Sequence, residues 1–242
     1  MDYLMNMSIG RSGSTLMNGI LNSFSGVLMR GENHFYLEHL SRAHRSLKKT
    51  REMENIESIT SPFFGGDEFD LTQWFDIQRV ATEKLLLGSK KKADVSILGF
   101  KEIRFIELAM DEIVDHLQFL DLLLPNFKII FHQRDLYQIS TSGWWAEYET
   151  SELMSKFRDY ENYLLLILET QFSERYLVTK YESVLENPKT IIDQLSEFLG
   201  ETPNLDEVHQ AISMEHSWKT SRVGQILGAK TVDLFPTISR TW

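Results

Sequence analysis

Two kinds of apolar pattern alternate along the chain. Short continuous apolar runs without helical period, each flanked by turn residues, lie at residues 3–9, 96–100, 127–132 and 176–179. Such runs are typical of buried parallel strands. Between them, apolar residues recur at helical spacing from Leu16 onward and over residues 71–85, 153–168 and 191–199. The alternation predicts a three-layer α/β fold, in which helices flank a central parallel sheet.

Length and composition suit one compact domain spanning residues 1–242, because 42% of the residues are hydrophobic and 25% are charged. The segment with the weakest pattern runs from Lys48 to Asp70, where charged residues precede Pro62 and the pair Gly65-Gly66. It is either a solvated loop or an insertion that covers a binding site.

Charge and cysteine content exclude several classes of function. The formal net charge of -10 argues against a protein that binds nucleic acid by neutralising phosphates. The chain has no cysteine, which excludes disulfides and Cys-ligated metal sites. No basic residue precedes Arg11, and the longest purely apolar run, Leu164–Leu168, is far too short to span a bilayer. We therefore expect a cytoplasmic protein without a membrane span.

The sequence Gly10-Arg11-Ser12-Gly13-Ser14-Thr15 stands between the first predicted strand and the first predicted helix. Its glycines allow close backbone approach, its hydroxyls are donors, and the following helix N-terminus favours an anion, so the loop is expected to bind phosphate. The alternative is an ordinary Ser-rich helix cap. A Walker A loop would have Lys where Ser14 stands, which disfavours ATP or GTP hydrolysis.

Arg134 follows the third apolar run, and Ser142 comes two helical turns later. A residue at the carboxyl end of a parallel strand faces the ligand crevice, so Arg134 and Ser142 are candidates for a second phosphate site. Alternatively, Arg134 pairs with Asp135 or a neighbouring carboxylate, and Trp144 and Trp145 are core residues.

Taken together with Lys180-Tyr181-Glu182 ahead of Asn187-Pro188, these segments resemble the sulfotransferase family over nearly the whole chain, least between about residues 48 and 96. The resemblance implies a P-loop-like fold and the cofactor 3'-phosphoadenosine 5'-phosphosulfate (PAPS), which yields 3',5'-ADP. The residues expected to hold the 5'-phosphosulfate are Arg11, Ser12, Gly13, Ser14 and Thr15.

The same resemblance assigns the 3'-phosphate to Arg134 and Ser142 and the adenine to Tyr181. Ser221 and Arg222 match a further phosphate-binding loop of the family, although Val223 stands where many relatives carry a second basic residue. An ordinary polar turn is the alternative for that segment.

Glu32, in Arg30-Gly31-Glu32-Asn33, resembles the catalytic base of tyrosylprotein and many bacterial sulfotransferases. His34 is a rival, because cytosolic sulfotransferases use a histidine base. Lys101 follows the second apolar run and resembles the basic residue that relatives use near the transferred sulfuryl group, where an ammonium offsets charge on the leaving oxygen. Glu102 and Arg104 could instead make Lys101 part of a structural salt-bridge cluster.

The sequence thus predicts sulfuryl transfer from PAPS to a hydroxyl acceptor, with Glu32, Arg11 and Lys101 as catalytic residues and without a metal ion. Carbohydrate, lipid, phenol, peptide tyrosine and polyketide hydroxyls all remain open as acceptors, because acceptor pockets lie in variable loops. The alternatives are a small-molecule or nucleoside kinase of related fold and a non-catalytic nucleotide-binding adaptor. The sequence makes no prediction of oligomeric state.

Overall fold

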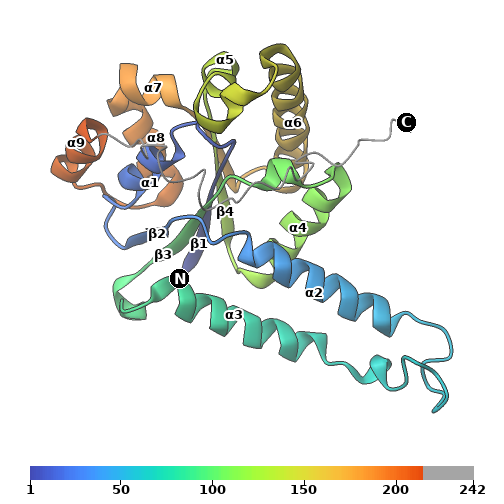
Figure 1. Cartoon of the computed structure of the whole chain (residues 1–242). Helices are drawn as coiled ribbons and strands as arrows, with labels where there is room; N and C mark the ends of the chain where they lie inside the picture. Colours follow the sequence, from blue (N-terminus) through green and yellow to red (C-terminus); the bar gives the residue numbers. More distant parts are fainter. Residues whose placement is uncertain (215–242) are drawn as a thin grey trace.

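A five-stranded, all-parallel sheet forms the centre of this computed structural model, which describes residues 1–214 (Figure 1). The predicted Ser221 and Arg222 lie outside the described residues. The strand order is β2-β3-β1-β4-β5. The strands are β1 (Asp2–Ser8), β2 (Val27–Arg30), β3 (Ile97–Glu102), β4 (Phe127–Gln133) and β5 (Tyr176–Lys180). The predicted α/β fold with a helix-flanked parallel sheet is confirmed.

Helices cover both faces of the sheet (Figure 1). The α-helices are α1 (Ser14–Leu21), α2 (Tyr36–Arg51), α3 (Leu71–Leu87), α4 (Met110–Leu123), α5 (Leu136–Ser140), α6 (Thr150–Gln171), α7 (Tyr181–Glu186), α8 (Pro188–Leu199) and α9 (Leu205–Ser213). Four 3-10 helices are η1 (Gly66–Glu68), η2 (Lys92–Asp94), η3 (Phe105–Glu107) and η4 (Gly143–Glu147). None of the helices within residues 1–214 is both long and apolar enough to cross a bilayer.

Alternation along β1 produces the three layers. Tyr3 and Met5 point into one apolar cluster, which also contains α4 and α6 residues, whereas Leu4 points into a second cluster with α1 and α8 residues. Both faces of the strand are buried, which explains why its sequence is a continuous apolar run. In α6, Phe157 and Leu164 are fully buried at the predicted helical spacing.

The predicted start of the 48–70 loop is wrong, because residues 48–51 belong to α2, which continues to Arg51. Residues 52–70 form a compact turn between α2 and α3, and these two helices run side by side as an arm that projects from the sheet (Figure 1). The apolar pattern did not identify α2, which is rich in charged residues and buries only Leu37, Glu38 and Ser41.

Candidate active site

All five strands end at one edge of the sheet, as parallel strands must, and each delivers a predicted site residue there. Glu32 follows β2, and Lys101 is the next-to-last residue of β3. The loop of residues 10–15 follows β1, Arg134 follows β4, and Tyr181 follows β5. The edge therefore collects residues from positions scattered over most of the described chain.

The loop after β1 has the geometry of an anion site. Arg11 and Gly13 adopt left-handed backbone conformations, with φ of 75° and 87°. Helix α1 begins immediately afterwards, and no side chain caps its N-terminus. Ser12 Oγ is buried and has no hydrogen-bond partner among the described residues. Uncapped helix N–H groups and an unpaired buried hydroxyl fit a phosphate ligand.

Glycine is required at two positions of this loop because neighbouring rings approach the backbone closely. A Cβ atom on Gly13 would lie 2.2 Å from Tyr181 Cδ2, and one on Gly10 would lie 2.7 Å from Trp144 Cζ2. The Tyr181 and Trp144 rings thus pack on the loop itself, where only Gly leaves room for them.

Lys101 links the loop to the candidate base. Its Nζ atom lies 2.7 Å from Glu32 Oε1 and donates a hydrogen bond of 3.2 Å to Thr15 Oγ1. The Lys101 side chain is only 11% exposed, whereas that of Glu32 is 38% exposed. The buried ammonium of Lys101 therefore positions the Glu32 carboxylate, which remains accessible to a molecule in solution.

Asparagines fix the positions of these elements. Asn6 Nδ2 donates to Asn18 Oδ1 (2.9 Å) and to the Ser14 carbonyl (3.0 Å), which ties β1 to α1. Asn18 Nδ2 donates in turn to the Arg30 carbonyl (2.8 Å) at the end of β2. The segment that carries Glu32 is thereby held against the helix that carries the phosphate loop.

Arg134 lies across the loop from Lys101. Its Nη1 atom donates to the Arg11 carbonyl (3.1 Å), and its Nη2 atom donates to Gln138 Oε1 (2.8 Å). The guanidinium also stacks over the Tyr181 ring, 4.4 Å from its centroid. Asp135 caps α5 through Gln138 N–H instead of pairing with Arg134. Within residues 1–214 no carboxylate forms an ion pair with Arg134, so its charge is available for a ligand.

Ser142 reaches the same loop but is not helical, contrary to the prediction, because α5 already ends at Ser140. Ser142 has an extended backbone and precedes η4. Its hydroxyl accepts a hydrogen bond from Arg11 Nε (3.3 Å). Arg11, Arg134 and Ser142 are thus brought together as one cluster.

Comparisons with known proteins identify the family to which this fold belongs. A sequence model described as the sulfotransferase family matches residues 7–205. The chain belongs to this family. Among solved structures, it is similar to the sulfotransferase domain from the curacin biosynthetic pathway, with a TM-score of 0.55, 16% identity, and coverage of 88% of this chain and 78% of that one. No curated protein is significantly similar to it.

A second similar structure is the sulfotransferase domain from the Synechococcus PCC 7002 olefin synthase. The TM-score is 0.55, the identity is 18%, and the similarity covers 95% of this chain and 82% of that chain. At such low identities the likeness establishes the fold, which is the P-loop-like fold expected from the sequence.

The adjacent residues Trp144 and Trp145 of this sulfotransferase differ in burial. Trp145 is 6% exposed, packs edge-on against Phe157, and donates from Nε1 to the Gly10 carbonyl (3.0 Å). Trp144 is 38% exposed, and the Arg11 guanidinium lies 5.8 Å from its ring centroid. The alternative in which both tryptophans are core residues holds for Trp145 alone, while Trp144 flanks the phosphate loop.

Glu102 and Arg104 do not pair with Lys101, which was the structural alternative for that lysine. Glu102 is 2% exposed, and its Oε1 atom accepts hydrogen bonds from Ile103 N–H and Arg104 N–H, each 2.9 Å. Burial raises the pKa of Glu102 to about 7, and the nearby Glu32 adds to that rise. Arg104 instead forms a two-pronged ion pair with Glu107.

His34, the rival base, is exposed and has a left-handed backbone with φ of 54°. It follows Glu32 by two positions and directly precedes the buried Phe35 at the start of α2. Unlike Glu32, it forms no ion pair or hydrogen bond with Lys101, and none with the phosphate loop, among the described residues.

Proposed function

We propose that this sulfotransferase takes its sulfuryl group from PAPS and passes it to a hydroxyl acceptor, with Glu32 as general base. The observation that carries the proposal is the position of the Lys101 ammonium, 2.7 Å from Glu32 Oε1 and 3.2 Å from Thr15 Oγ1. A base, a cation and a phosphate-type loop meet at one point, which is the arrangement that in-line transfer requires.

The residues present suit the cofactor. When bound, PAPS would supply an activated sulfuryl group whose departure leaves 3',5'-ADP. The buried, unpaired Ser12 hydroxyl and the uncapped N-terminus of α1 favour the 5'-phosphosulfate in the loop of residues 11–15. Arg134, which lacks a carboxylate partner among the described residues, and Ser142 are assigned to the 3'-phosphate.

Tyr181 is proposed to contact the adenine. Its ring already forms one wall of the cluster, because Arg134 stacks on it and Gly13 packs against it. An aromatic face fixed beside two phosphate sites suits a nucleobase, which stacks on such rings.

Proton transfer is assigned to the half-exposed Glu32 carboxylate, which would accept the proton of the acceptor hydroxyl. Protonation neutralises Glu32, so Lys101 loses its ion-pair partner at that moment. Its ammonium, which is also bonded to Thr15 in the loop, is then free to stabilise negative charge on the departing phosphate oxygen, with Arg11 and the loop amides.

Thermal denaturation with added nucleotides tests the cofactor. A ligand at 100 times its Kd stabilises a protein by about 2.7 kcal/mol, which raises the Tm of a chain of this size by roughly 5–10 °C. We expect that rise with 3',5'-ADP in the absence of Mg²⁺. A rise only with ATP and Mg²⁺ would favour a kinase, and no rise with either would favour a non-catalytic adaptor.

Transfer itself is tested with radiolabelled PAPS and a panel of hydroxyl compounds comprising a phenol, a sugar, an aliphatic alcohol and a tyrosyl peptide. Labelled product from at least one class is the expected result. Binding of 3',5'-ADP without transfer to any class would separate cofactor recognition, which would stand, from the proposed reaction, which would not.

A further inference from the structure

The arm formed by α2 and α3 ends in a surface that the proposed function does not use (Figure 1). We call residues 52–70 the arm tip. Its backbone is internally hydrogen-bonded, since Gly65 N–H donates to the Ile56 carbonyl (3.2 Å) and Gly66 N–H donates to the Phe63 carbonyl (3.0 Å). Ile56 is buried beneath it. The arm tip therefore presents a preformed surface, and binding to it would cost little conformational entropy of the tip itself.

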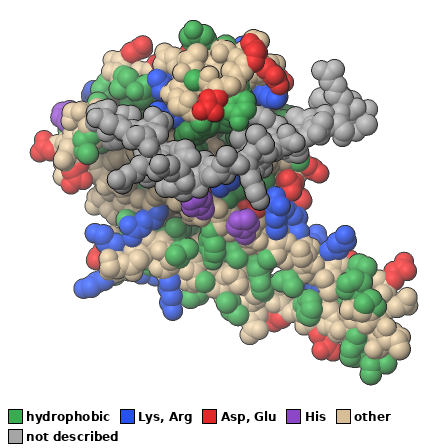
Figure 2. Space-filling model, in the orientation of Figure 1, with side chains coloured by type: hydrophobic (Ala, Val, Ile, Leu, Met, Phe, Trp, Pro, Cys, Tyr) green, Lys and Arg blue, Asp and Glu red, His purple; other side chains and the backbone are tan. Residues whose placement is uncertain are grey.

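Large apolar side chains are concentrated on this surface. Ile59 is 82% exposed and Phe64 is 58% exposed, and Phe63 and Phe69 are also exposed. Figure 2 shows apolar and acidic side chains gathered at the far end of the arm. Scattered exposed apolar residues are ordinary, but several on one ordered turn are typical of an interaction surface.

The charge of the arm tip restricts the partner. Exposed Lys48, Lys49 and Arg51 adjoin it at the end of α2. Residues 52–70 themselves contain no Lys, Arg or His, and their six acidic residues are all exposed. They are Glu52, Glu54, Glu57, Asp67, Glu68 and Asp70. Like charges repel anionic membranes, nucleic acid and the tip of a second copy, and the chain as a whole carries a net charge of -10. A surface with basic groups around an apolar stripe is complementary.

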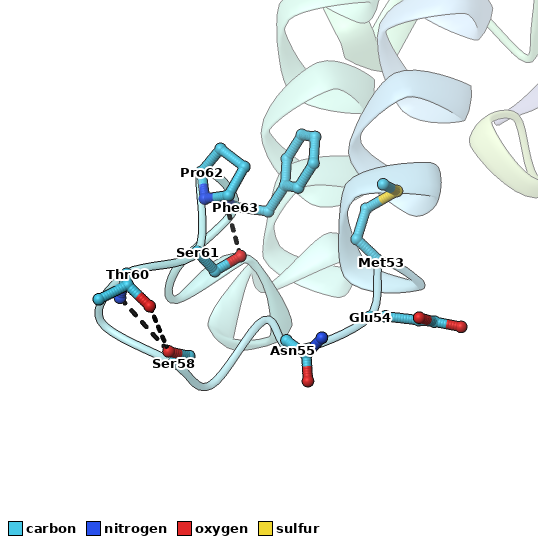
Figure 3. A pocket seen from close by; sticks show the side chains of 8 residues that line it. All are labelled: Met53, Glu54, Asn55, Ser58, Thr60, Ser61, Pro62 and Phe63. Carbon is cyan, nitrogen blue, oxygen red and sulfur yellow. Dashed lines mark hydrogen bonds between the residues drawn. The ribbon is translucent and has the colours of Figure 1, made fainter.

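A hollow of about 530 Å³ lies within the arm tip (Figure 3). Met53 and Phe63 extend to the same side of it, while Glu54 points outward beside it. Ser58 and Ser61 add hydroxyl groups to its wall. A lining that combines apolar side chains with a carboxylate and hydroxyls can contact both the aliphatic stem and the charged head of a lysine or arginine.

We propose that the arm tip docks a basic amphipathic segment of a partner protein, with a lysine or arginine side chain of that segment in the hollow. Helix α2 has 16 residues and begins at Tyr36, four positions after Glu32, so the tip lies roughly 24 Å from the helix start. A docked partner is thus held near the candidate site without covering it. This inference goes beyond the proposed function and does not depend on it.

The test is fluorescence anisotropy with a labelled 18-residue Lys/Leu peptide that forms an amphipathic helix. A Glu/Leu peptide of the same pattern and a Lys/Ser peptide separate the charged and apolar contributions. One variant neutralises the tip through Glu54→Gln, Glu57→Gln and Asp67→Asn. A matched variant neutralises three exposed carboxylates elsewhere, through Glu186→Gln, Glu197→Gln and Asp206→Asn. A third removes apolar surface through Ile59→Ser and Phe64→Ser.

We expect saturable binding of the Lys/Leu peptide, at least tenfold weaker in the neutralised tip variant and in the Ile59→Ser, Phe64→Ser variant. The matched variant should change affinity less than twofold. All substituted side chains are exposed, and unchanged melting curves would verify the fold. Equal losses in the tip and matched variants, equal binding of the Glu/Leu peptide, or no saturable binding at all would each overturn the proposal. So would binding to anionic lipid vesicles that the same tip variants abolish.

Discussion

The Lys101 ammonium and the Glu32 carboxylate form an ion pair of 2.7 Å, although the two residues are 69 positions apart in the chain. The pairing follows from the sheet, since β2 and β3 are neighbours in register, with Arg30 opposite Phe100. Glu32 therefore lies just beyond the end of one strand, beside the last residues of the other. The same ammonium donates a hydrogen bond to Thr15, so one cation contacts both the proposed base and the proposed cofactor loop.

Glu32→Gln tests the base. We expect turnover to fall roughly 100- to 10,000-fold, the usual contribution of a positioned general base, because the amide keeps the side chain's size but cannot accept the proton. Affinity for 3',5'-ADP should be retained, since Glu32 is assigned to the acceptor's side. Steady-state rates at saturating PAPS, beside calorimetric binding, separate the two effects.

His34→Gln is the control for that substitution. It changes a neighbouring exposed side chain that forms no ion pair or hydrogen bond with Lys101 among the described residues, so turnover should remain within a few-fold of the parent. Near-normal turnover in Glu32→Gln together with a collapse in His34→Gln would transfer the base role to His34.

Arg134→Ala should weaken 3',5'-ADP binding by about 2–4 kcal/mol, because it removes a charge-assisted contact to a partly desolvated phosphate. Adenosine 5'-phosphosulfate, which lacks the 3'-phosphate, should lose far less. Arg158→Ala, on the exposed face of α6, is a control that removes the same charge elsewhere and should leave both affinities unchanged. Equal losses for the two nucleotides in calorimetry would place Arg134 outside the 3'-phosphate site.

Whether a feature of this site could be predicted depended on how far apart in the sequence the interacting residues are. Local patterns sufficed to place the loop of residues 10–15 and Arg134 at the carboxyl ends of strands, because each directly follows an apolar run. The Lys101–Glu32 pair could not be predicted, since it requires knowing that β2 and β3 are neighbours. From the sequence, the alternative partners of Lys101 were its chain neighbours Glu102 and Arg104. In the structure, Glu102 accepts a hydrogen bond from Arg104 N–H, and the Arg104 guanidinium pairs with Glu107.

Two features were missed for different reasons. Helix α2 has only a narrow apolar stripe, with Leu37, Leu40 and Leu47 at helical spacing among many charged side chains, and this weak pattern was not recognised as a helix. The packing of Trp144 on Gly10 and Arg11 joins positions more than 130 residues apart, and nothing local to either segment marks it. The glycines of the loop did signal a close approach, although the sequence could not show which ring makes it.

Gly13→Ala should abolish detectable 3',5'-ADP binding and lower stability by about 1–3 kcal/mol, the cost of holding a non-glycine residue in a strained conformation. The new methyl group would meet Tyr181 at 2.2 Å in a backbone with φ of 87°. Gly31→Ala is the matched control, since a Cβ atom there has nothing within 4 Å. Denaturant melts and calorimetry on both variants check this, and similar behaviour of the two would contradict it.

Trp145→Phe should destabilise the protein by about 1–3 kcal/mol, because the buried Gly10 carbonyl loses its indole donor and packing volume is removed. Trp144→Phe should cost less than about 0.5 kcal/mol, since that ring is 38% exposed. Urea unfolding measures both changes. A change in nucleotide affinity at constant stability in Trp144→Phe would show that this ring also lines the ligand site.

Three buried groups and the partly buried Glu161 should give the protein an unusual dependence of stability on pH. His116 and His132 are each 1% exposed, and burial lowers the pKa of each to about 3. Below about pH 6.5 the two histidines are protonated in the unfolded chain but stay neutral in the folded protein. Their contribution to stability therefore falls as pH falls. Burial raises the pKa of Glu102 and of Glu161 to about 7. Above about pH 4.5 the two carboxyls are ionised in the unfolded chain but stay protonated in the folded protein. Their contribution to stability therefore falls as pH rises.

The two effects oppose each other between about pH 4.5 and 6.5 and should nearly cancel there. Below about pH 4.5 the carboxyls are protonated in both states, and each histidine then lowers the free energy of unfolding by up to about 1.4 kcal/mol per pH unit. Combining Glu102→Gln with Glu161→Gln removes the opposing pair. In that variant, urea unfolding from pH 3.5 to 7.5 should show stability declining already from about pH 6.5. An unchanged profile would mean that the two carboxyls titrate alike in the folded and unfolded chains.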